Sequence, residues 1–300
     1  MGTILDKIIA HKREELKLVK KLRPLEEIIS SLKDNKYIQS SFSKIYDSLR
    51  STTDSSRWHV NRLESLLEKS RFESNAFYKA LSTKSGVNII AEVKKGSPSK
   101  GIICEDFDHI SIAKEYEFSG AKAISVLTDE RFFFGKLEYL MDIRREVKIP
   151  LLRKDFIVDE YQIFEAKESG ANAILLIAAI LEPEEMVEFL RVTDSLGMDA
   201  LVEVHNFEEL NMVLKTHARI IGINNRNLKD FTVDLNTTLD LVNSIPKDKV
   251  IVSESGIHTR NDIAKLLSHG VNTFLIGEAL VRDGGISKKM SDFLAPYNNI

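Results

Sequence analysis

Acidic and basic side chains stand at the ends of short apolar runs in this 300-residue chain. In the run 87–94, Glu92 and Lys94 are two residues apart, so both point to the same face of a strand. One such charge is usually a solvated residue or half of an ion pair. A mixed group is different, because burying unpaired charges is costly and close acids and amines shift one another's pKa values. The pattern predicts a polar site that gives and takes protons, drawn from the charged strand ends at residues 92–94, 153–155, 203, 224–226 and 254–256.

Glycines follow the last two strand-like runs of the chain. Gly256 comes directly after Ser255, and Gly277 comes directly before Glu278. In barrels of alternating strands and helices, the loops at these two places commonly hold a phosphate with backbone N–H groups. A single loop glycine is only a turn residue, but the pair in this location favours phosphate binding. Lys94 can add a point charge to such a site.

The remaining polar and aromatic candidates carry less information. The seven histidines have no H-x-x-x-H spacing, so we predict no metal site. His205 and His258 each follow a strand-like run, and a local hydrogen bond is the simpler interpretation of both. Phe133 follows another run, and beside a charged site it can form a wall for an aromatic substrate. The turn-rich segment 97–101 is either a lid or a connection.

The elements that must position these residues are eight apolar, β-branched runs that alternate with helical patterns from residue 87 onward. Their starts are about 20 to 35 residues apart, which leaves room for one helix each. This alternation predicts an α/β fold, a (β/α)8 barrel with its chemistry at the carboxyl ends of the strands. A doubly wound sheet is the alternative, but it more often has fewer strands and a G-x-G-x-x-G turn, which does not follow residue 94. The eight runs are 87–94, 122–128, 149–154, 172–178, 199–204, 219–224, 249–255 and 272–277.

The first 86 residues have a different texture from the rest. Apolar residues at positions 4, 5, 8, 9, 16 and 19 repeat on one helical face, which predicts an amphipathic helix. Residues 30–59 are polar and Ser-rich, and we expect weak helix there. We therefore expect residues 1–86 to form a helical extension packed against a barrel of residues 87–300. Three glycines stand just before strand-like runs, where a left-handed residue ends a helix: Gly120, Gly170 and Gly270.

The overall composition excludes several classes of function. The chain has 42 Lys and Arg against 45 Asp and Glu, a net charge of −3, so it has no basic excess for binding nucleic acid. The single Cys104 cannot form an internal disulfide, which fits a reducing cytoplasm. The longest apolar stretch, 173–181, is less than half of the roughly 20 residues that span a bilayer, so we expect no membrane span. A barrel can act alone, which favours a monomer.

The candidate residues fall in motifs that resemble the indole-3-glycerol-phosphate synthase family. The motifs, in barrel order after the first, are ILDKIIAHKREEL, IIAEVKKGSPSKG, SVLTDERFFFG, LLRKDFIVDEYQI, LLIAAIL, LVEVH, IGINNRNL, VSESGI and FLIGEAL. The similarity departs mainly in the polar stretch 30–70, where the family has a shorter connection. The resemblance implies conversion of 1-(2-carboxyphenylamino)-1-deoxyribulose 5-phosphate into indole-3-glycerol phosphate, carbon dioxide and water in tryptophan biosynthesis. It also implies that no organic cofactor or metal takes part.

The resemblance implies a role for each matching residue. Lys154 matches the general acid that protonates the ribulose carbonyl, and Glu203 matches the carboxylate for the later acid/base work. Lys94 matches a lysine that contacts phosphate or carboxylate and donates a second proton, with Glu92 orienting it. Asn224 and Glu254 match ligands of the ribulose hydroxyls, and Ser97 and Arg226 match positions near the anthranilate carboxylate. The wall around the aromatic ring is matched by Phe133, Phe156, Leu175 and Leu228. The phosphate loops are matched by Ser255, Gly256, Gly277 and Glu278. Asn225, Leu275 and Ile276 complete the predicted substrate-binding set.

Two other functions are weighed against this one. Phosphoribosylanthranilate isomerase is a barrel of the same pathway with a related phosphate site, but it relies on a cysteine in the first strand and a later aspartate. Here that strand has Glu92 and Lys94 instead. A catalytically silent barrel that only binds would be expected to have lost one of the lysines or glutamates, and all of them are present.

Overall fold

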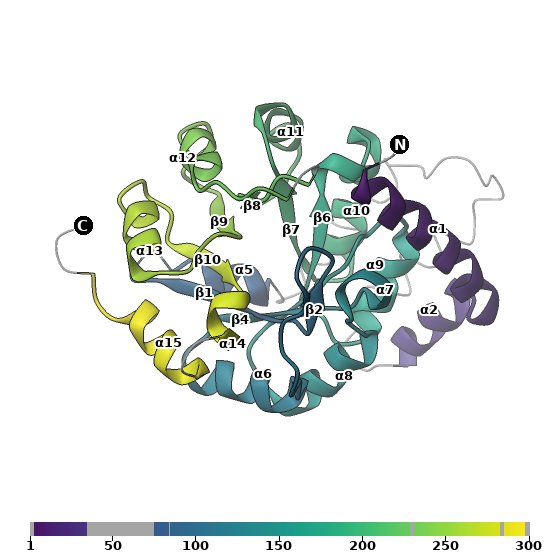
Figure 1. The fold of residues 1–300 in the computed structure, drawn as a ribbon. Coiled ribbons are helices and arrows are strands. Elements are labelled where there is room, and N and C mark those ends of the chain that lie inside the picture. Colours follow the sequence, from purple (N-terminus) through teal and green to yellow (C-terminus); the bar gives the residue numbers. More distant parts are fainter. Residues whose placement is uncertain (1–2, 35–74, 84, 229–230, 283–284, 298–300) are drawn as a thin grey trace.

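Eight parallel strands close into a barrel in the computed structural model, which describes residues 3–34, 75–83, 85–228, 231–282 and 285–297 (Figure 1). The order around the barrel is β1-β10-β9-β8-β7-β6-β5-β4, so each strand pairs with its neighbours in sequence. The predicted barrel is confirmed, and the ends of the eight predicted runs agree with the observed strands to within two residues. The strands are β1 (Asn88–Val93), β4 (Ala123–Leu127), β5 (Leu151–Lys154), β6 (Ala173–Ile177), β7 (Asp199–Val204), β8 (Ile220–Asn224), β9 (Val250–Glu254) and β10 (Thr273–Ile276).

Helices follow the strands and surround the barrel (Figure 1). Glycines at positions 120, 170 and 270 have φ angles of 92°, 89° and 83°, so the predicted left-handed helix ends are confirmed. A short antiparallel pair, β2 (Gly96–Ser97) and β3 (Gly101–Ile102), lies in the loop after β1. The barrel helices are α6 (His109–Phe118), α7 (Glu130–Phe133), α8 (Leu137–Glu146), α9 (Glu160–Glu168), the 3-10 helix η1 (Ala178–Ile180), α10 (Pro183–Ser195), α11 (Phe207–Val213), α12 (Asn236–Val242), α13 (Arg260–Leu267), α14 (Glu278–Arg282) and α15 (Ile286–Leu294).

The barrel interior is apolar at one end and polar at the other. Ile90, Leu152 and Leu201 belong to an inner core, which helix α5 (Ala76–Leu81) joins through the buried side chains of Phe77 and Leu81. Because strand residues two apart share a face, the inward positions that follow these apolar residues toward the carboxyl ends are occupied by charged side chains. A larger apolar core lies between the strands and the surrounding helices. The apolar end of the interior therefore supports the polar end, which lies at the carboxyl ends of the strands.

Two helices of the N-terminal segment dock on the side of the barrel near α9 (Figure 1). Helix α1 (Ile4–Leu22) begins with a capping box, in which the side chains of Thr3 and Asp6 accept each other's backbone N–H. Helix α2 (Leu25–Asp34) follows and packs on α9. Lys20 is 2.6 Å from Asp159, so ion pairs help to hold the segment on the barrel. The predicted weak helix of residues 30–59 lies mostly outside the described residues.

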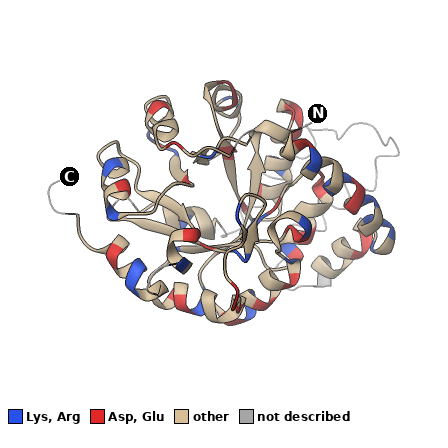
Figure 2. Cartoon of the chain, viewed as in Figure 1, with Lys and Arg blue, Asp and Glu red and all other residues tan. Residues whose placement is uncertain are grey.

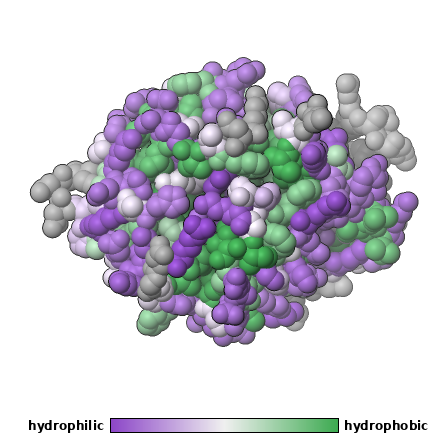
Figure 3. Space-filling model, in the orientation of Figure 1, coloured by the Kyte–Doolittle hydropathy of each residue, from purple (hydrophilic) through white to green (hydrophobic). Residues whose placement is uncertain are grey.

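The surface of the described residues mixes both signs of charge. Lys and Arg are mixed with Asp and Glu along the outer helices (Figure 2), in keeping with the near-neutral composition. In the space-filling view, hydrophobic residues gather near the middle of the face, inside a rim in which hydrophilic residues predominate (Figure 3). Among the described residues, no helix combines the length and the apolar character needed to cross a membrane.

Candidate active site

Five polar side chains from five strands line one pocket at the carboxyl ends of the barrel. They are Glu92 of β1, Lys154 of β5, Glu203 of β7, Asn224 of β8 and Glu254 of β9. The three glutamates and Asn224 are buried, and the Lys154 side chain is only 15 % exposed. Side chains alternate between the inside and the outside of the barrel along each strand, and in these five strands the polar residue at or near the carboxyl end is at an inward position.

The Lys154 ammonium group lies between two of these glutamates. Its Nζ is 3.3 Å from Oε2 of Glu203 and 3.2 Å from Oε2 of Glu254. Burial alone would lower the pKa of Lys154, but the negative charges of Glu254 and Glu203 outweigh burial and raise it above the usual 10.5. The side chain is therefore a fixed, largely buried cation with a carboxylate on each side.

The two glutamates beside Lys154 have different proton affinities. Burial, opposed by Lys154 but reinforced by the charge of Glu203, raises the pKa of Glu254 to about 7. For Glu203, burial is outweighed by Lys154 and His205, which lower its pKa below the usual range. Oε1 of Glu254 is buried and has no hydrogen-bond partner among the described residues, as suits a carboxyl group that holds a proton. At neutral pH this arrangement places a charged carboxylate and a carboxyl group that is partly protonated on either side of one lysine.

A second ion pair stands nearer the mouth of the pocket. Nζ of Lys94 is 2.5 Å from Oε2 of Glu92. The carboxylate fits because residue 277 is a glycine: a Cβ at Gly277 would lie 2.5 Å from the same oxygen. Burial opposes the charge on Glu92, but Lys94 and Lys154 outweigh burial and lower the pKa of Glu92. Lys94 is thus oriented by a charged, buried carboxylate.

Two sharp turns lie on the opposite side of the pocket from the Lys154 strand, after β9 and β10. Ser255 and Gly256 have consecutive left-handed φ angles of 65° and 79°, and Ser255 is one of the few residues other than glycine with that conformation in the described chain. After β10, Gly277 leads into α14, whose first residue Glu278 is 2.8 Å from Lys100. This ion pair ties the loop after β1 to α14. Each turn contains a glycine, so at these two places the backbone can line the pocket directly.

An apolar wall completes the pocket. The rings of Phe133 and Phe156 are 5.9 Å apart, and Leu175 and Leu228 line the same pocket. Arg226 also lines it, and its backbone N–H donates to Asn224 at 3.0 Å. A flat aromatic group with a carboxylate can therefore contact apolar side chains while a guanidinium group lies within the same pocket.

The structure brings the predicted site residues together, with one exception. All of them except Asn225 line the pocket. The side chain of Asn225 points outward, where its amide donates to the Ser253 hydroxyl and the Glu254 carbonyl and its oxygen accepts from Thr238. Asn225 is 2 % exposed and joins β8 to β9 and α12, so its place in the structure is that of a support for the loop.

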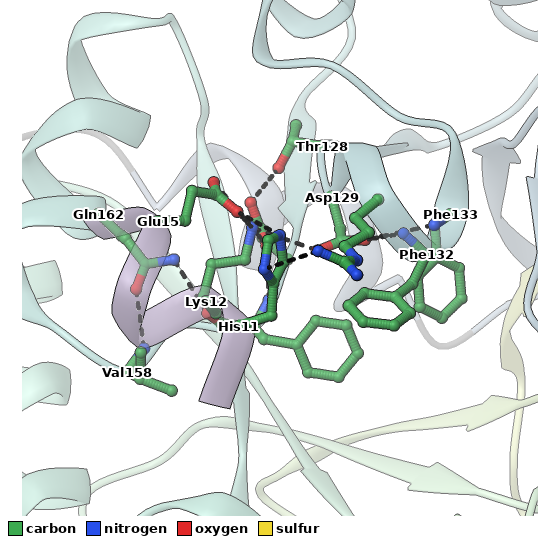
Figure 4. Close-up of polar contacts among 12 residues, drawn as sticks. His11, Lys12, Glu15, Thr128, Asp129, Phe132, Phe133, Val158 and Gln162 are labelled. Carbon is green, nitrogen blue, oxygen red and sulfur yellow. Dashed lines mark hydrogen bonds and ion pairs between the residues drawn. The ribbon is translucent and has the colours of Figure 1, made fainter. Parts of the chain in front are cut away.

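One buried lysine was missed by the sequence analysis. Lys12 of α1 is 2 % exposed, and its Nζ is 3.2 Å from carboxylate oxygens of both Asp129 and Asp155. Figure 4 shows its side chain pointing from α1 toward Asp129, with Glu15 at its other side. A signal was available, because Lys12 is spaced by four from Ile8 and by four from the apolar residue at position 16, so it stands on the buried stripe of the helix.

Lys12 connects the N-terminal helix to both sides of the aromatic wall. The Asp129 carboxylate accepts hydrogen bonds from the backbone N–H groups of Phe132 and Phe133, and so caps the start of α7 (Figure 4). Asp155 directly follows Lys154, and its carboxylate accepts a hydrogen bond from the backbone N–H of Phe156. One ammonium group thus contacts the carboxylates of both loops that carry the paired phenylalanines of the wall.

No metal-binding group emerges from the part of the chain that the structure describes. No set of three or more His, Cys, Asp or Glu side chains there has a geometry that could hold a metal ion. Cys104 is partly buried and packs against the outer apolar core, away from the pocket.

Comparison with known proteins gives a consistent family match. A family model described as indole-3-glycerol phosphate synthase matches residues 42–293. A relative of that description from Alkaliphilus metalliredigens is 44 % identical over 289 residues, covering 96 % of this chain and 97 % of the relative. One from Acetivibrio thermocellus is 53 % identical over 219 residues, covering 73 % and 84 %. The structure of 3-hexulose-6-phosphate synthase from Salmonella typhimurium shares the fold alone, with a TM-score of 0.56 and 10 % identity over 69 % of this chain and 96 % of that one.

Proposed function

The chain belongs to the indole-3-glycerol phosphate synthase family of carboxy-lyases in tryptophan biosynthesis, and from this premise we propose how its pocket carries out the reaction. The substrate is 1-(2-carboxyphenylamino)-1-deoxyribulose 5-phosphate, and the products are indole-3-glycerol phosphate, carbon dioxide and water. The observation that carries the proposal is one buried lysine, Lys154, held between two glutamates of different proton affinity beside an aromatic wall.

Ring closure is the first step. The ring carbon that bears the carboxylate attacks the ribulose carbonyl carbon, and the carbonyl oxygen becomes a hydroxyl by taking a proton from Lys154. Negative charge develops on that oxygen in the transition state, so a fixed ammonium group next to it stabilises the transition state more than the substrate. Positive charge develops on the anilino group, and the neighbouring carboxylates stabilise it.

Loss of carbon dioxide and then of water completes the reaction. When the carbon–carbon bond to the carboxylate breaks, its electron pair restores the aromatic ring. The new hydroxyl then leaves as water with a proton from Lys94, which Glu92 orients at 2.5 Å. Glu203, the charged carboxylate, accepts the proton lost from the ring that forms. Two protons are donated and one is returned, through Glu203, from the ring that forms. Because the substrate's carboxylate leaves as carbon dioxide, the second proton that recharges the lysines is taken up from water.

The rest of the pocket binds the ends of the substrate. The aromatic ring contacts Phe133 and Phe156, and Arg226 pairs with its carboxylate. The phosphate is bound by backbone N–H groups of the turns at Ser255–Gly256 and Gly277–Glu278, which are predicted phosphate loops. Asn224 and Glu254 contact the ribulose hydroxyls.

The proposal also covers the setting of the reaction. The near-neutral net charge of −3 and the local placement of lysines and glutamates suit a small anionic substrate rather than nucleic acid. We infer a monomer, because all the side chains assigned roles in the reaction come from the strands and loops of one barrel. The single cysteine suits the cytoplasm.

The direct test is whether the purified protein converts the proposed substrate. The carboxyphenylamino-deoxyribulose phosphate is mixed with the protein, and indole fluorescence is followed. We expect the rate at which fluorescence increases to be proportional to the protein concentration. Turnover of phosphoribosylanthranilate in place of this substrate would assign the protein to the isomerase instead, and binding of the substrate without turnover would mark a silent barrel.

A further inference from the structure

A histidine connects the charged glutamate of the pocket to a second carboxylate outside it. Nε2 of His205 is 3.2 Å from Oε1 of Glu203, and Nδ1 is 2.9 Å from Oε2 of Glu209. The local hydrogen bond expected for His205 is confirmed by the contact with Glu209. Nε2 is buried and has no hydrogen-bond partner among the described residues, so its polar contact is the ion pair with Glu203.

The outer carboxylate is held in place by the backbone. Glu209 lies in the first turn of α11, and its Oε2 also accepts the backbone N–H of His205 at 2.8 Å. Its Oε1 accepts from the Asn206 side chain at 2.6 Å, and Asn206 in turn caps α11 by accepting the Glu209 N–H. Since Glu209 is fixed by these contacts, the imidazole ring that it holds is fixed as well.

His205 carries a positive charge in this arrangement. Burial opposes the charge, but the carboxylates of Glu203 and Glu209 outweigh burial and raise the pKa of His205 to about 10. Glu203 therefore has a cation on each oxygen: His205 at Oε1 and Lys154 at Oε2. Glu254 has Lys154 alone, and its Oε1 has no partner within the described residues.

The pair of glutamates is asymmetric because of this second cation. Both are buried and both contact the same lysine, so lysine contact alone would not decide which one holds a proton. The other polar groups that face Glu203 are Asn224 of β8, which donates to it, and Glu92 of β1, whose charge acts on the shared lysine. Neither adds a positive charge, which leaves His205 as the cation that distinguishes Glu203 from Glu254 among the described residues.

We propose that His205, held by Glu209, is a positioning residue for the reaction: it orients the Glu203 carboxylate and directs the proton of the glutamate pair to Glu254. This inference rests on the proposed function of the pocket. It makes Glu203 the proton acceptor of the pair and Glu254 the member that donates a hydrogen bond to the ribulose. The histidine itself does not touch the reacting atoms.

The test is the pH dependence of His205→Gln, which removes the charge and retains groups that can hydrogen-bond. Below about pH 7 the pair of Glu203 and Glu254 holds one proton. In the variant this proton is shared between the two glutamates, so Glu203 is charged for only part of the time. We expect kcat to fall by about 10- to 100-fold at pH 6 with a much smaller change in KM. The ratio of variant to wild-type kcat should rise as the pH increases from 6 to 8, since Glu203 regains its charge.

The matched control is His217→Gln. His217 is an exposed histidine whose Nε2 is 3.0 Å from Asp194, so it has the same kind of partner but lies outside the pocket. It should give the wild-type profile. Glu209→Gln, which leaves His205 in place but weakens its hold, should shift the profile in the same direction as His205→Gln by a smaller amount. This second variant decides the matter if His205→Gln does not fold.

The outcomes separate this inference from the proposed function. If the wild-type protein does not form indole-3-glycerol phosphate, the proposed function is wrong. If the wild type is active and His205→Gln has a kcat ratio that does not change between pH 6 and 8, the positioning role is wrong. A loss of thermal stability together with a uniform, pH-independent loss of activity would show that His205 is merely structural, and would also overturn the inference.

Discussion

Replacing Lys12 by methionine tests whether the N-terminal helix is part of the barrel's active structure. Methionine keeps the length and apolar stem of lysine but lacks the ammonium group. In the wild type this group is 3.2 Å from both Asp129 and Asp155, and all three side chains are at most 2 % exposed. Oδ2 of Asp129 has no hydrogen-bond partner within the described residues, so Lys12 provides its compensating charge.

The size of the loss of stability follows from the charges that remain buried after the ammonium group is removed. After the substitution, Asp155 keeps the nearby Arg153 guanidinium, 3.2 Å away, but Oδ2 of Asp129 is buried without a cation. Breaking a buried ion pair by removing one partner lowers stability by about 3–5 kcal/mol. Because domains are commonly stable by about 5–15 kcal/mol, this is a large fraction of the total. The loops that carry Phe133 and Phe156 should also loosen, which raises KM for the aromatic substrate.

The assay is urea unfolding of Lys12→Met beside Lys17→Met. Lys17 is on the same helix and pairs with Glu14 at 2.7 Å, but both side chains are about two-thirds exposed. An exposed pair of this kind is worth about 0–1 kcal/mol, so the control should unfold almost like the wild type. A loss of less than about 1 kcal/mol for Lys12→Met would refute the reasoning, because the ion pairs would then have no more value than a surface contact.

Two further predictions follow from the geometry. Gly277→Ala places a methyl group 2.5 Å from the Glu92 carboxylate, so Glu92 must move away from Lys94, and steady-state assays should give a kcat lowered by about 10-fold or more. Burial, reinforced by the charges of Glu188 and Asp159, raises the pKa of Glu160 to about 7, so folding favours its protonated form. The wild-type free energy of unfolding should therefore fall relative to that of Glu160→Gln as the pH rises from about 4.5 to 7, and urea titrations at several pH values would measure it; parallel curves would contradict it.

The fold and most of the site could be predicted because both depend on local patterns. Alternating apolar runs specify the strands, and a charged residue two positions beyond an apolar inward residue must point into the same end of the barrel. The same rule could have separated Asn224 from Asn225, because neighbours on a strand point to opposite sides. Asn225 was included with the substrate ligands although alternation directs it outward, toward Thr238.

The remaining contacts depend on partners far apart in the sequence. Lys12 meets Asp129 and Asp155 only when α1 docks on the barrel, and spacing along α1 identifies a buried lysine without naming its partners. In the same way, the sequence places His205 after a strand and predicts a local contact. Which glutamate holds a proton depends on distances across the barrel, between β5, β7 and β9, that no local pattern contains.

The central claim is that Lys154 donates the proton for ring closure, and turnover of Lys154→Met tests it most directly. The measurement is the rate of indole-3-glycerol phosphate formation, with Lys114→Met as the control, since Lys114 is an exposed lysine paired with Glu146 on the outer helices. The account predicts that kcat falls by about 10²- to 10⁴-fold for Lys154→Met and is unchanged for the control. A folded Lys154→Met protein with wild-type kcat would contradict the account.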